Sequence, residues 1–222
     1  MRKKFIITID GPAGAGKSTV SKILAKNLNY IYLDTGALYR ALAYKSLKKN
    51  ISLEDVDALA GLCSTTAVAL KNFDGRIKVY VDGEDVEEKI RTEEVSMTAS
   101  KISTYAVVRE KLLDLQRKTG IRGGVVAEGR DMGSVVFPHA EYKFYLDAKI
   151  EERIKRRYKE LLDKGSSVEY QSVQNDMLRR DKQDKQRKIA PLIIPDGAVI
   201  IDSDNLTVQG VVDKIASYIS IK

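Results

Sequence analysis

Apolar and polar positions along the first fifty residues follow two different rhythms. A β-branched run at residues 5–9 is typical of a buried parallel strand, and it ends at a polar residue and a glycine. From residue 17 to residue 29 the apolar positions recur at the spacing of a helix. A second strand at 31–33 and a second helix at 37–47 repeat this order. The alternation predicts an α/β fold in which helices flank a parallel sheet.

Residues 65–86 interrupt this order. Two short alternating runs, at 67–71 and 76–81, lie on either side of a turn signal at 72–75. Such a pattern is typical of two antiparallel strands joined by a tight turn. We therefore expect a β-hairpin inserted into the α/β chain.

The rest of the chain returns to helices and strands. Helices are predicted at 92–103, 107–118, 151–164, 172–182 and 208–219, and strands at 125–128, 142–147 and 198–202. Each of these strands ends in a polar residue, at the edge where a parallel sheet holds its ligands. The first two helices would return the inserted segment to the main domain.

Composition and charge narrow the class of protein. A chain of 222 residues can bury the core of one such domain, and its net charge of +7 is compatible with nucleic acid, acidic lipid or a phosphorylated small molecule. The arginines gather in the last third of the chain without a lysine-rich tail. This distribution favours a localised binding site over a positive charge spread across the protein surface. The single cysteine, Cys63, rules out an intramolecular disulfide and favours a reducing cytoplasm. No apolar run approaches the ~18 residues of a membrane span.

The segment between the first strand and the first helix carries a phosphate-binding motif. Residues 11–18 read GPAGAGKS, which matches GxxxxGK[ST] in its expected context. Its glycines allow main-chain N–H groups to surround phosphate oxygens at a helix N-terminus. Lys17 would add a charge for the β- and γ-phosphates, and the Ser18 hydroxyl would bind Mg²⁺. We expect the ATP site to comprise Gly11, Pro12, Ala13, Gly14, Ala15, Gly16, Lys17, Ser18 and Thr19.

The phosphate loop alone does not identify the phosphoryl acceptor. No NKxD-like guanine-reading motif is present, which disfavours a GTPase, and the chain is short for a motor or helicase, although Glu128 or Asp147 could supply a strand-end acid. The many arginines favour a kinase, because phosphoryl transfer relies on positioning and charge neutralisation. Segments 34–36 and 129–131 each follow a predicted strand, so both should lie beside the loop.

Five long motifs together resemble the bacterial cytidylate kinase family of P-loop nucleoside monophosphate kinases. In chain order they are ITIDGPAGAGKST, LDTGALYRALA, KIRTEEVSMTAS, VAEGRDMGSVVFPHA and RDKQDKQRKIAPL. They extend over nearly the whole chain and distinguish it from adenylate, thymidylate and shikimate kinases, which share only the loop. Glu128 and His139 are mild departures from the family pattern.

The resemblance implies a P-loop nucleotide kinase fold in three parts. The CORE would comprise residues 1–62, 122–148 and 188–222, and the inserted nucleoside-monophosphate-binding domain about 63–121. A short LID would comprise about 149–187. The resemblance also implies that this insertion and the LID close over the bound nucleotides.

The resemblance assigns contacts to the acceptor residue by residue. It implies that Thr35 lies near the acceptor and that Arg40 and Arg130 hold the acceptor phosphate. It also implies that the cytosine base is read by Ser100, Arg109 and Asp131, and that sugar and phosphate contacts come from Arg180, Asp184 and Arg187. Arg153 and Arg157 would reach the ATP phosphates from the LID. The expected catalytic side chains are those of Lys17, Arg130 and Arg180.

The expected activity is transfer of the γ-phosphoryl group of ATP, with Mg²⁺, to CMP or dCMP. The expected partners are these small nucleotides, with neither nucleic acid nor membrane, and the expected state is a cytoplasmic monomer. Two alternatives stay open at this point: a kinase for UMP or another small acceptor, and a basic nucleotide-gated module that binds nucleic acid.

Overall fold

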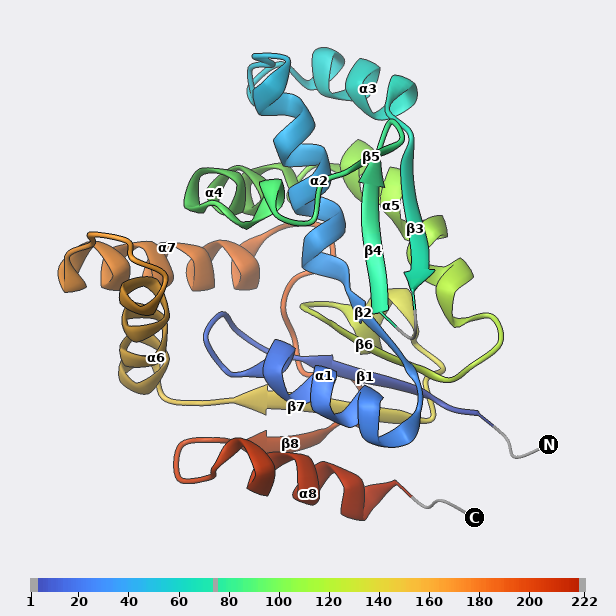
Figure 1. The fold of residues 1–222 in the computed structure, drawn as a ribbon, viewed down its shortest axis with the longest axis vertical. Helices are drawn as coiled ribbons and strands as arrows, with labels where there is room; N and C mark the ends of the chain where they lie inside the picture. Colours follow the sequence, from blue (N-terminus) through green and yellow to red (C-terminus); the bar gives the residue numbers. More distant parts are fainter. Residues whose placement is uncertain (1–3, 74–75, 220–222) are drawn as a thin grey trace.

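The computed structural model describes residues 4–73 and 76–219. Within them, one sheet runs through the molecule in the order β3-β4-β2-β6-β1-β7-β8 (Figure 1). Its strands are β1 (Ile6–Asp10), β2 (Ile31–Asp34), β3 (Val68–Phe73), β4 (Arg76–Val81), β6 (Val125–Gly129), β7 (Tyr142–Asp147) and β8 (Val199–Asp202), and the short β5 (Glu84–Asp85) pairs with β4. The five strands β2, β6, β1, β7 and β8 are parallel, which confirms the predicted α/β sheet.

Eight α-helices surround this sheet in the described residues. They are α1 (Lys17–Leu28), α2 (Thr35–Lys48), α3 (Val56–Thr65), α4 (Glu93–Ile102), α5 (Ala106–Gly120), α6 (Ile150–Asp163), α7 (Tyr170–Gln186) and α8 (Val208–Tyr218). A 3₁₀ turn, η1 (Lys89–Arg91), and a π-helical turn, η2 (Met132–Val136), are shorter. Residues of α1 and α8 pack with β1, β7 and β8 in one hydrophobic cluster, and residues of η2 pack with β2 and β6 in another.

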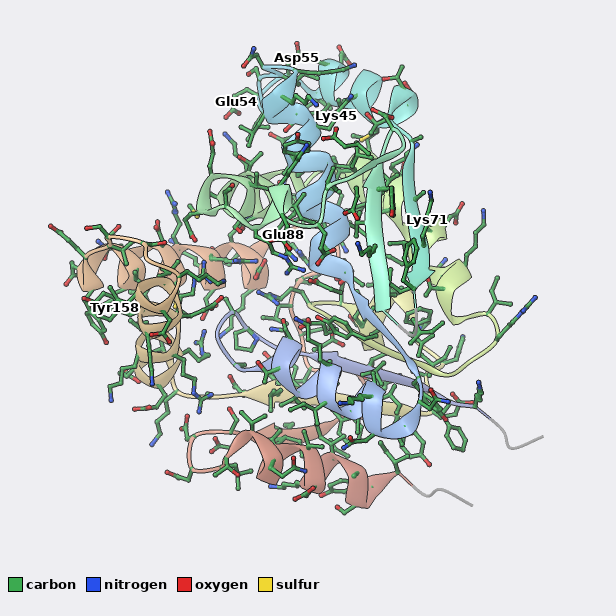
Figure 2. All side chains as sticks on the ribbon, viewed as in Figure 1. Lys45, Glu54, Asp55, Lys71, Glu88 and Tyr158 are labelled. Atoms are coloured by element: carbon green, nitrogen blue, oxygen red, sulfur yellow. The ribbon has the colours of Figure 1, made fainter. Side chains whose placement is uncertain are left out.

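The predicted strands and long helices are confirmed to within a few residues, but α3 was not predicted. Its sequence, VDALAGLCST, contains a glycine and ends in polar residues, so its helical periodicity is weak. The missed signal lies at its start, where the Asp55 side chain accepts from the Ala58 N–H at 2.8 Å as an N-cap (Figure 2).

The predicted hairpin forms and joins the main sheet. Strands β3 and β4 pair antiparallel from Val68 opposite Val81, and β4 pairs with β2 through Tyr32 and Arg76. Residues 74–75 of the predicted turn lie outside the described residues, while the other two residues of that turn belong to β3. The hairpin therefore extends the sheet at its edge.

Helix α2 shares its hydrophobic core with the inserted segment. Leu38 and Leu42 on α2 are fully buried in a cluster that also contains Leu59 of α3, Val79 of β4 and Ile102 of α4. The expected boundary of the insertion at residue 63 stays a prediction. The packing shows that α2, which precedes that boundary, and α3, which spans it, are held by the same core as the segment that follows it.

Helices α6 and α7 form a separate unit that projects to one side of the sheet (Figure 1). Ile154, Leu161, Val173 and Met177 form its small core, and Tyr158 packs against it (Figure 2). The two helices are joined by a turn in which Gly165 has φ 78°, a left-handed conformation that favours glycine. Ala13 of the phosphate loop also packs against this small core.

None of the helices among residues 4–73 and 76–219 has the length and apolar character needed to cross a membrane.

Replacing Leu42 with alanine tests the shared core of α2 and the insertion. Because Leu42 is fully buried, Leu42→Ala should lower the free energy of unfolding by about 2–5 kcal/mol, measured by urea denaturation. The matched control is Leu162→Ala on α6, where the leucine is 46% exposed and the loss should stay below about 0.5 kcal/mol. Equal losses in the two variants would contradict the assignment of Leu42 to a core.

Candidate active site

The phosphate loop between β1 and α1 has the backbone that its glycines predict. Gly11, Gly14 and Gly16 have φ values of 146°, 75° and 92°. A Cβ atom at Gly11 would lie 2.0 Å from the main-chain oxygen of Leu146 on β7, so no larger residue fits there without moving the strand. The loop thereby holds the N-terminus of α1, with its free N–H groups, toward an open cleft.

Lys17 is the buried cation of this loop. Its side chain is 6% exposed, and its Nζ donates to the Pro12 main-chain oxygen at 2.6 Å. Burial, and then the nearby Arg130 guanidinium, lower the pKa of Lys17 to about 7. An anion placed beside it would stabilise the charged form.

A second charged group lies at the end of β2. Asp34 caps α2 by accepting from the Ala37 N–H at 3.0 Å, and it accepts from Arg40 Nη2 at 2.8 Å. Arg91 approaches the same carboxylate at 3.6 Å. Burial acts to raise the pKa of Asp34, but Arg40 and Arg91 outweigh it and hold the pKa below its usual value. Asp34 therefore holds the Arg40 and Arg91 side chains in place, and both guanidinium groups line the cleft.

Glu128 ends β6 between the phosphate loop and β2. It is 4% exposed, and the Tyr32 hydroxyl donates to its carboxylate. Its main-chain oxygen accepts from the Thr35 hydroxyl at 2.7 Å. Burial, followed by the charge of Asp34, raises the pKa of Glu128, while Lys17 and a hydrogen bond with Ser18 oppose the shift. This residue connects the loop with the start of α2.

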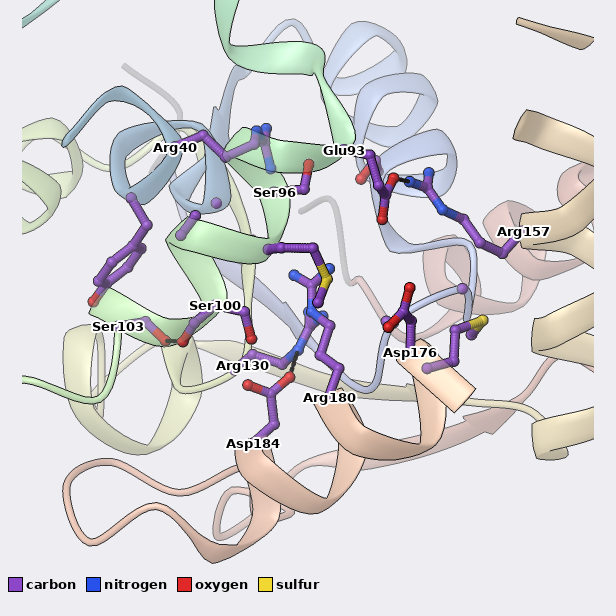
Figure 3. A pocket seen from close by; sticks show the side chains of 18 of the residues that line it. Arg40, Glu93, Ser96, Ser100, Ser103, Arg130, Arg157, Asp176, Arg180 and Asp184 are labelled. Atoms are coloured by element: carbon purple, nitrogen blue, oxygen red, sulfur yellow. Dashed lines mark hydrogen bonds and ion pairs between the residues drawn. The ribbon is translucent and has the colours of Figure 1, made fainter. Parts of the chain in front are cut away.

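Arg130 and Arg180 form the centre of the cleft (Figure 3). Arg130 Nε donates to Asp184 Oδ2 at 2.7 Å. The buried Nε of Arg180 has no hydrogen-bond partner in the described part of the chain. Burial, and then the charge of Arg130, lower the pKa of Arg180 to about 10. Asp184 is the carboxylate hydrogen-bonded to Arg130, and the unpartnered Nε of Arg180 leaves a donor for an anionic ligand.

Asp131 lies next to this pair and is held by two further arginines. It forms an ion pair with Arg109, and Arg187 Nη2 approaches it at 3.5 Å. Arg109 also donates to the Ser103 main-chain oxygen at 3.1 Å, from behind the wall of the cleft. Burial raises the pKa of Asp131, although both arginines oppose it. The carboxylate is therefore fixed in orientation beside the cleft.

Ser100 faces the cleft from α4 and is bound from behind by α7. The Gln183 Nε2 donates to the Ser100 main-chain oxygen at 2.6 Å and to its Oγ at 3.0 Å. Sequence reasoning missed Gln183 because the pairing joins positions 83 residues apart. Its only local signal is its place between Arg180 and Asp184 on the same helix.

The two arginines expected in the LID have different surroundings. Arg153 is 5% exposed, donates to the main-chain oxygens of Ala148 and Ala13, and forms an ion pair with Asp181 at 2.7 Å. Arg157 lines the cleft and joins Glu93 on α4 at 2.5 Å (Figure 3). Arg153 therefore holds the phosphate loop through the Ala13 main-chain oxygen. Arg157 instead connects α6 with α4 across the cleft through its ion pair with Glu93.

One cleft of about 410 Å³ collects most of the predicted site, a volume within the usual range of ligand pockets. It is lined by Ala13, Gly14, Lys17, Ser18, Thr35, Arg40, Ser100, Arg130, Asp131, Arg157, Arg180, Asp184 and Arg187. Arg109 and Arg153 do not line it, and neither do the loop residues Gly11, Pro12, Ala15, Gly16 and Thr19. Arg91 and Glu93, which the sequence analysis did not name, line the same cleft, and so does Asp34, whose segment 34–36 was expected beside the loop.

Asp10 is a further residue that the sequence analysis did not assign to the site. Its buried carboxylate accepts from the N–H groups of Met132 at 2.8 Å and Gly133 at 2.7 Å. Burial raises its pKa to about 6. These bonds fix the start of η2 against β1, and so place Arg130 and Asp131 beside the phosphate loop. The signal that marked Asp10 was its position at the end of a buried strand.

Known proteins resemble this chain over almost its whole length. Residues 7–221 match the family model described as cytidylate kinase. The chain is 47% identical over 213 residues to the cytidylate kinase of Caldicellulosiruptor bescii, covering 96% of this chain and 94% of that relative. It is 46% identical over 222 residues to the cytidylate kinase of Bacillus subtilis, covering 100% of this chain and 99% of the relative.

A solved structure of an uncharacterized protein from Eubacterium ventriosum has the same fold. Its TM-score is 0.55 at 13% identity, covering 99% of this chain and 100% of that chain. Likeness at this identity extends to the fold alone, whereas the family match and the identities near one half extend over the whole sequence. The chain therefore belongs to the cytidylate kinase family and is a phosphotransferase.

Proposed function

We propose that this chain transfers the γ-phosphoryl group of ATP to CMP or dCMP, forming ADP and the cytidine diphosphate. The observation that carries the proposal is a single cleft with two cationic regions, one at Lys17 in the phosphate loop and one at Arg40, Arg130 and Arg180. Two such regions suit a reaction between two phosphorylated molecules. Membership of the cytidylate kinase family supports cytidine as the acceptor nucleoside.

In this proposal ATP lies along residues 11–19 at the start of α1. The loop N–H groups and Lys17 hold the β- and γ-phosphates, and Arg157 reaches them from α6 after leaving Glu93. Arg153 contributes by holding the loop, since it is bonded to the Ala13 main-chain oxygen at 3.1 Å.

The residues beside the loop fit a magnesium ion that arrives with the nucleotide. Among the described residues, no group of three His, Cys, Asp or Glu side chains could hold a metal without help. Ser18 lines the cleft next to Glu128, which suits an ion held mainly by phosphate oxygens and water. Bound there, Mg²⁺ would neutralise charge on the β- and γ-phosphates.

The acceptor nucleotide lies on the opposite side of the cleft. Thr35, Arg40 and Arg130 hold its phosphate, and Arg180 and Arg187 share the phosphate and sugar contacts. Asp184 accepts from a ribose hydroxyl, because Arg130 and Arg180 outweigh its burial and hold its pKa below the usual value. An ionised carboxylate is an acceptor only, as this role requires.

The cytosine base is read by Asp131 and Ser100. Cytosine presents an amino donor next to a ring acceptor and a carbonyl, so an Asp acceptor and a Ser donor complement it. Arg109 acts on the base through Asp131, with which it forms a buried ion pair. Asp131 and Ser100 select the base, with Asp131 held by Arg109, and the arginines around the phosphate do not.

Transfer proceeds by in-line attack of an acceptor phosphate oxygen on the γ-phosphorus. No strong general base is needed, because a phosphate monoester is largely ionised at neutral pH. Lys17, Arg130 and Arg180 neutralise the charge that spreads over the equatorial oxygens. Residues 149–187 form the LID and about 63–121 the acceptor-binding insertion, and their closure excludes water from the reacting phosphate.

We further propose that the enzyme acts in the cytoplasm as a monomer. Cys63, the single cysteine, is a buried free thiol, which fits a reducing compartment. A monomer fits because residues of one chain supply every contact assigned above.

An assay of acceptors tests the proposed function. The purified chain with ATP and Mg²⁺ should form ADP with CMP or dCMP as acceptor, with the diphosphate product identified by chromatography. A panel containing UMP, AMP and GMP separates the alternatives. Preferred transfer to UMP or to a non-nucleotide acceptor would contradict the proposal, and so would the absence of any ADP.

Replacing Lys17 with alanine tests the phosphate loop. Lys17→Ala should lower kcat at least a hundredfold, because a buried cation that faces the transferred charge is lost. Lys26→Ala, which removes an exposed lysine from the same helix, should keep the original rate. Circular dichroism checks that both variants fold. A wild-type rate in Lys17→Ala would remove this lysine from the mechanism.

Proton uptake on nucleotide binding tests the pKa of Lys17. With a pKa of about 7, most Lys17 side chains are neutral at pH 8, and the triphosphate should convert them to ammonium. Binding of ATP without acceptor should therefore take up nearly one proton at pH 8 and very little at pH 6. Calorimetry in buffers of different ionisation enthalpy measures this uptake.

The control for proton uptake is Lys17→Ala, which shows the contribution of the nucleotide itself. The difference between the original protein and the variant should be present at pH 8 and nearly absent at pH 6. The same difference at both pH values would contradict a lowered pKa.

A further inference from the structure

One glutamine joins the two helices that flank the base side of the cleft. Gln183 on α7 donates from Nε2 to both oxygens of Ser100 on α4, at 2.6 Å for the main-chain oxygen and 3.0 Å for Oγ. Ser100 lines the cleft, and Gln183 lies outside its wall. Figure 3 shows Ser100 facing the region of Arg130 and Asp184. The glutamine therefore acts on the cleft through Ser100.

The geometry determines which way the Gln183 amide points. A main-chain oxygen can only accept a hydrogen bond, so the atom 2.6 Å from it must be the NH₂ nitrogen of the amide. This nitrogen also lies 3.0 Å from Ser100 Oγ, and because it carries donors only, Oγ accepts.

The Ser100 hydroxyl keeps its own proton for another partner. Within residues 4–73 and 76–219, the hydroxyl has no acceptor of its own, since its hydrogen bond is the one it receives from Gln183. The side chain lines the cleft, so a ligand there can take the proton. Ser100 is thus presented to a ligand as a donor.

We infer that Gln183 is a positioning residue that holds the Ser100 hydroxyl as a hydrogen-bond donor and thereby sets the preference for cytosine over uracil. The inference rests on the proposed function, in which Ser100 faces the base. The ring atom N3 accepts a hydrogen bond in cytosine but carries a proton in uracil. With one lone pair of Oγ already engaged by Gln183, the hydroxyl can donate its proton to N3 of cytosine, whereas accepting from N3–H of uracil would use its remaining lone pair and leave its own proton without the base as a partner.

Charge-changing and volume-preserving variants test this role. In Gln183→Glu the carboxylate can only accept, so it should take the Ser100 proton away from the base. The ratio of kcat/KM for CMP to kcat/KM for UMP should fall about tenfold, the size expected for one hydrogen bond. The KM for ATP should not change. Gln183→Met, which cannot donate and accepts only weakly, should lower the same ratio by a smaller factor.

Gln186→Glu is the matched control. Gln186 is exposed one turn further along α7, and the substitution makes the same change of charge without contact to Ser100. The ratio should stay at its original value in this variant. If Gln186→Glu lowered the ratio as much as Gln183→Glu does, general charge on α7 would explain the effect and the inference would be wrong.

Two further outcomes separate this inference from a purely structural role. If Gln183→Glu lowered kcat/KM for CMP and UMP by the same factor, Gln183 would only hold α7 against α4. In a Ser100→Ala background, Gln183→Glu should leave the ratio unchanged, and a further drop would show that the effect bypasses Ser100.

The proposed function and this inference fail in different ways. A wild-type protein that forms no cytidine diphosphate overturns the proposed function, whereas an active wild type with an unchanged ratio in Gln183→Glu overturns the inference alone. Thermal melting identifies a variant that does not fold. In that case Gln183→Met, which keeps the side-chain volume, decides on the same ratio.

Discussion

The main physical constraint on this structure is the partial burial of several positively charged side chains, Lys17, Arg130 and Arg180, in one cleft. Burial lowers the pKa values of Lys17 and Arg180, and the charge of Arg130 lowers them further. Such a cluster costs free energy unless opposite charge compensates it. Asp184 pairs with Arg130, and Glu128 lies near Lys17, but the Nε of Arg180 has no partner among the described residues. The remaining positive charge is available to phosphate oxygens.

The sheet supplies the rigid frame on which these charges are placed. The ends of β1, β2 and β6 lie next to one another, because their parallel registers place Asp10 opposite Gly129 and Asp34 opposite Glu128. The two N–H groups bound by Asp10 fix the segment that carries Arg130 and Asp131. Neighbouring strand ends thus convert distant sequence positions into one site, as parallel sheets generally do.

Local pattern was sufficient to predict the strands, most helices and the phosphate loop. Each depends on periodicity or on a motif within about a dozen residues, and the later site residues came from the family resemblance. Pairings between distant positions could not be read in this way. Arg153 and Arg157 lie one turn apart on α6, yet one supports the loop and the other spans the cleft. Their different roles depend on which segments α6 packs against, and the spacing of residues within α6 carries no information about those segments.

Helix α2 connects the cleft with the hydrophobic core that it shares with α3, β4 and α4. Its first residue is Thr35 and its 14 residues extend for about 21 Å. Its far half is packed with α3 and α4, whereas β4 meets β2 at a single residue pair. If α2 rotated as a rigid helix by roughly 10° about its first residue, its far end would move by about 3–4 Å. A small rotation at the cleft end of α2 would therefore produce a larger displacement at its far end.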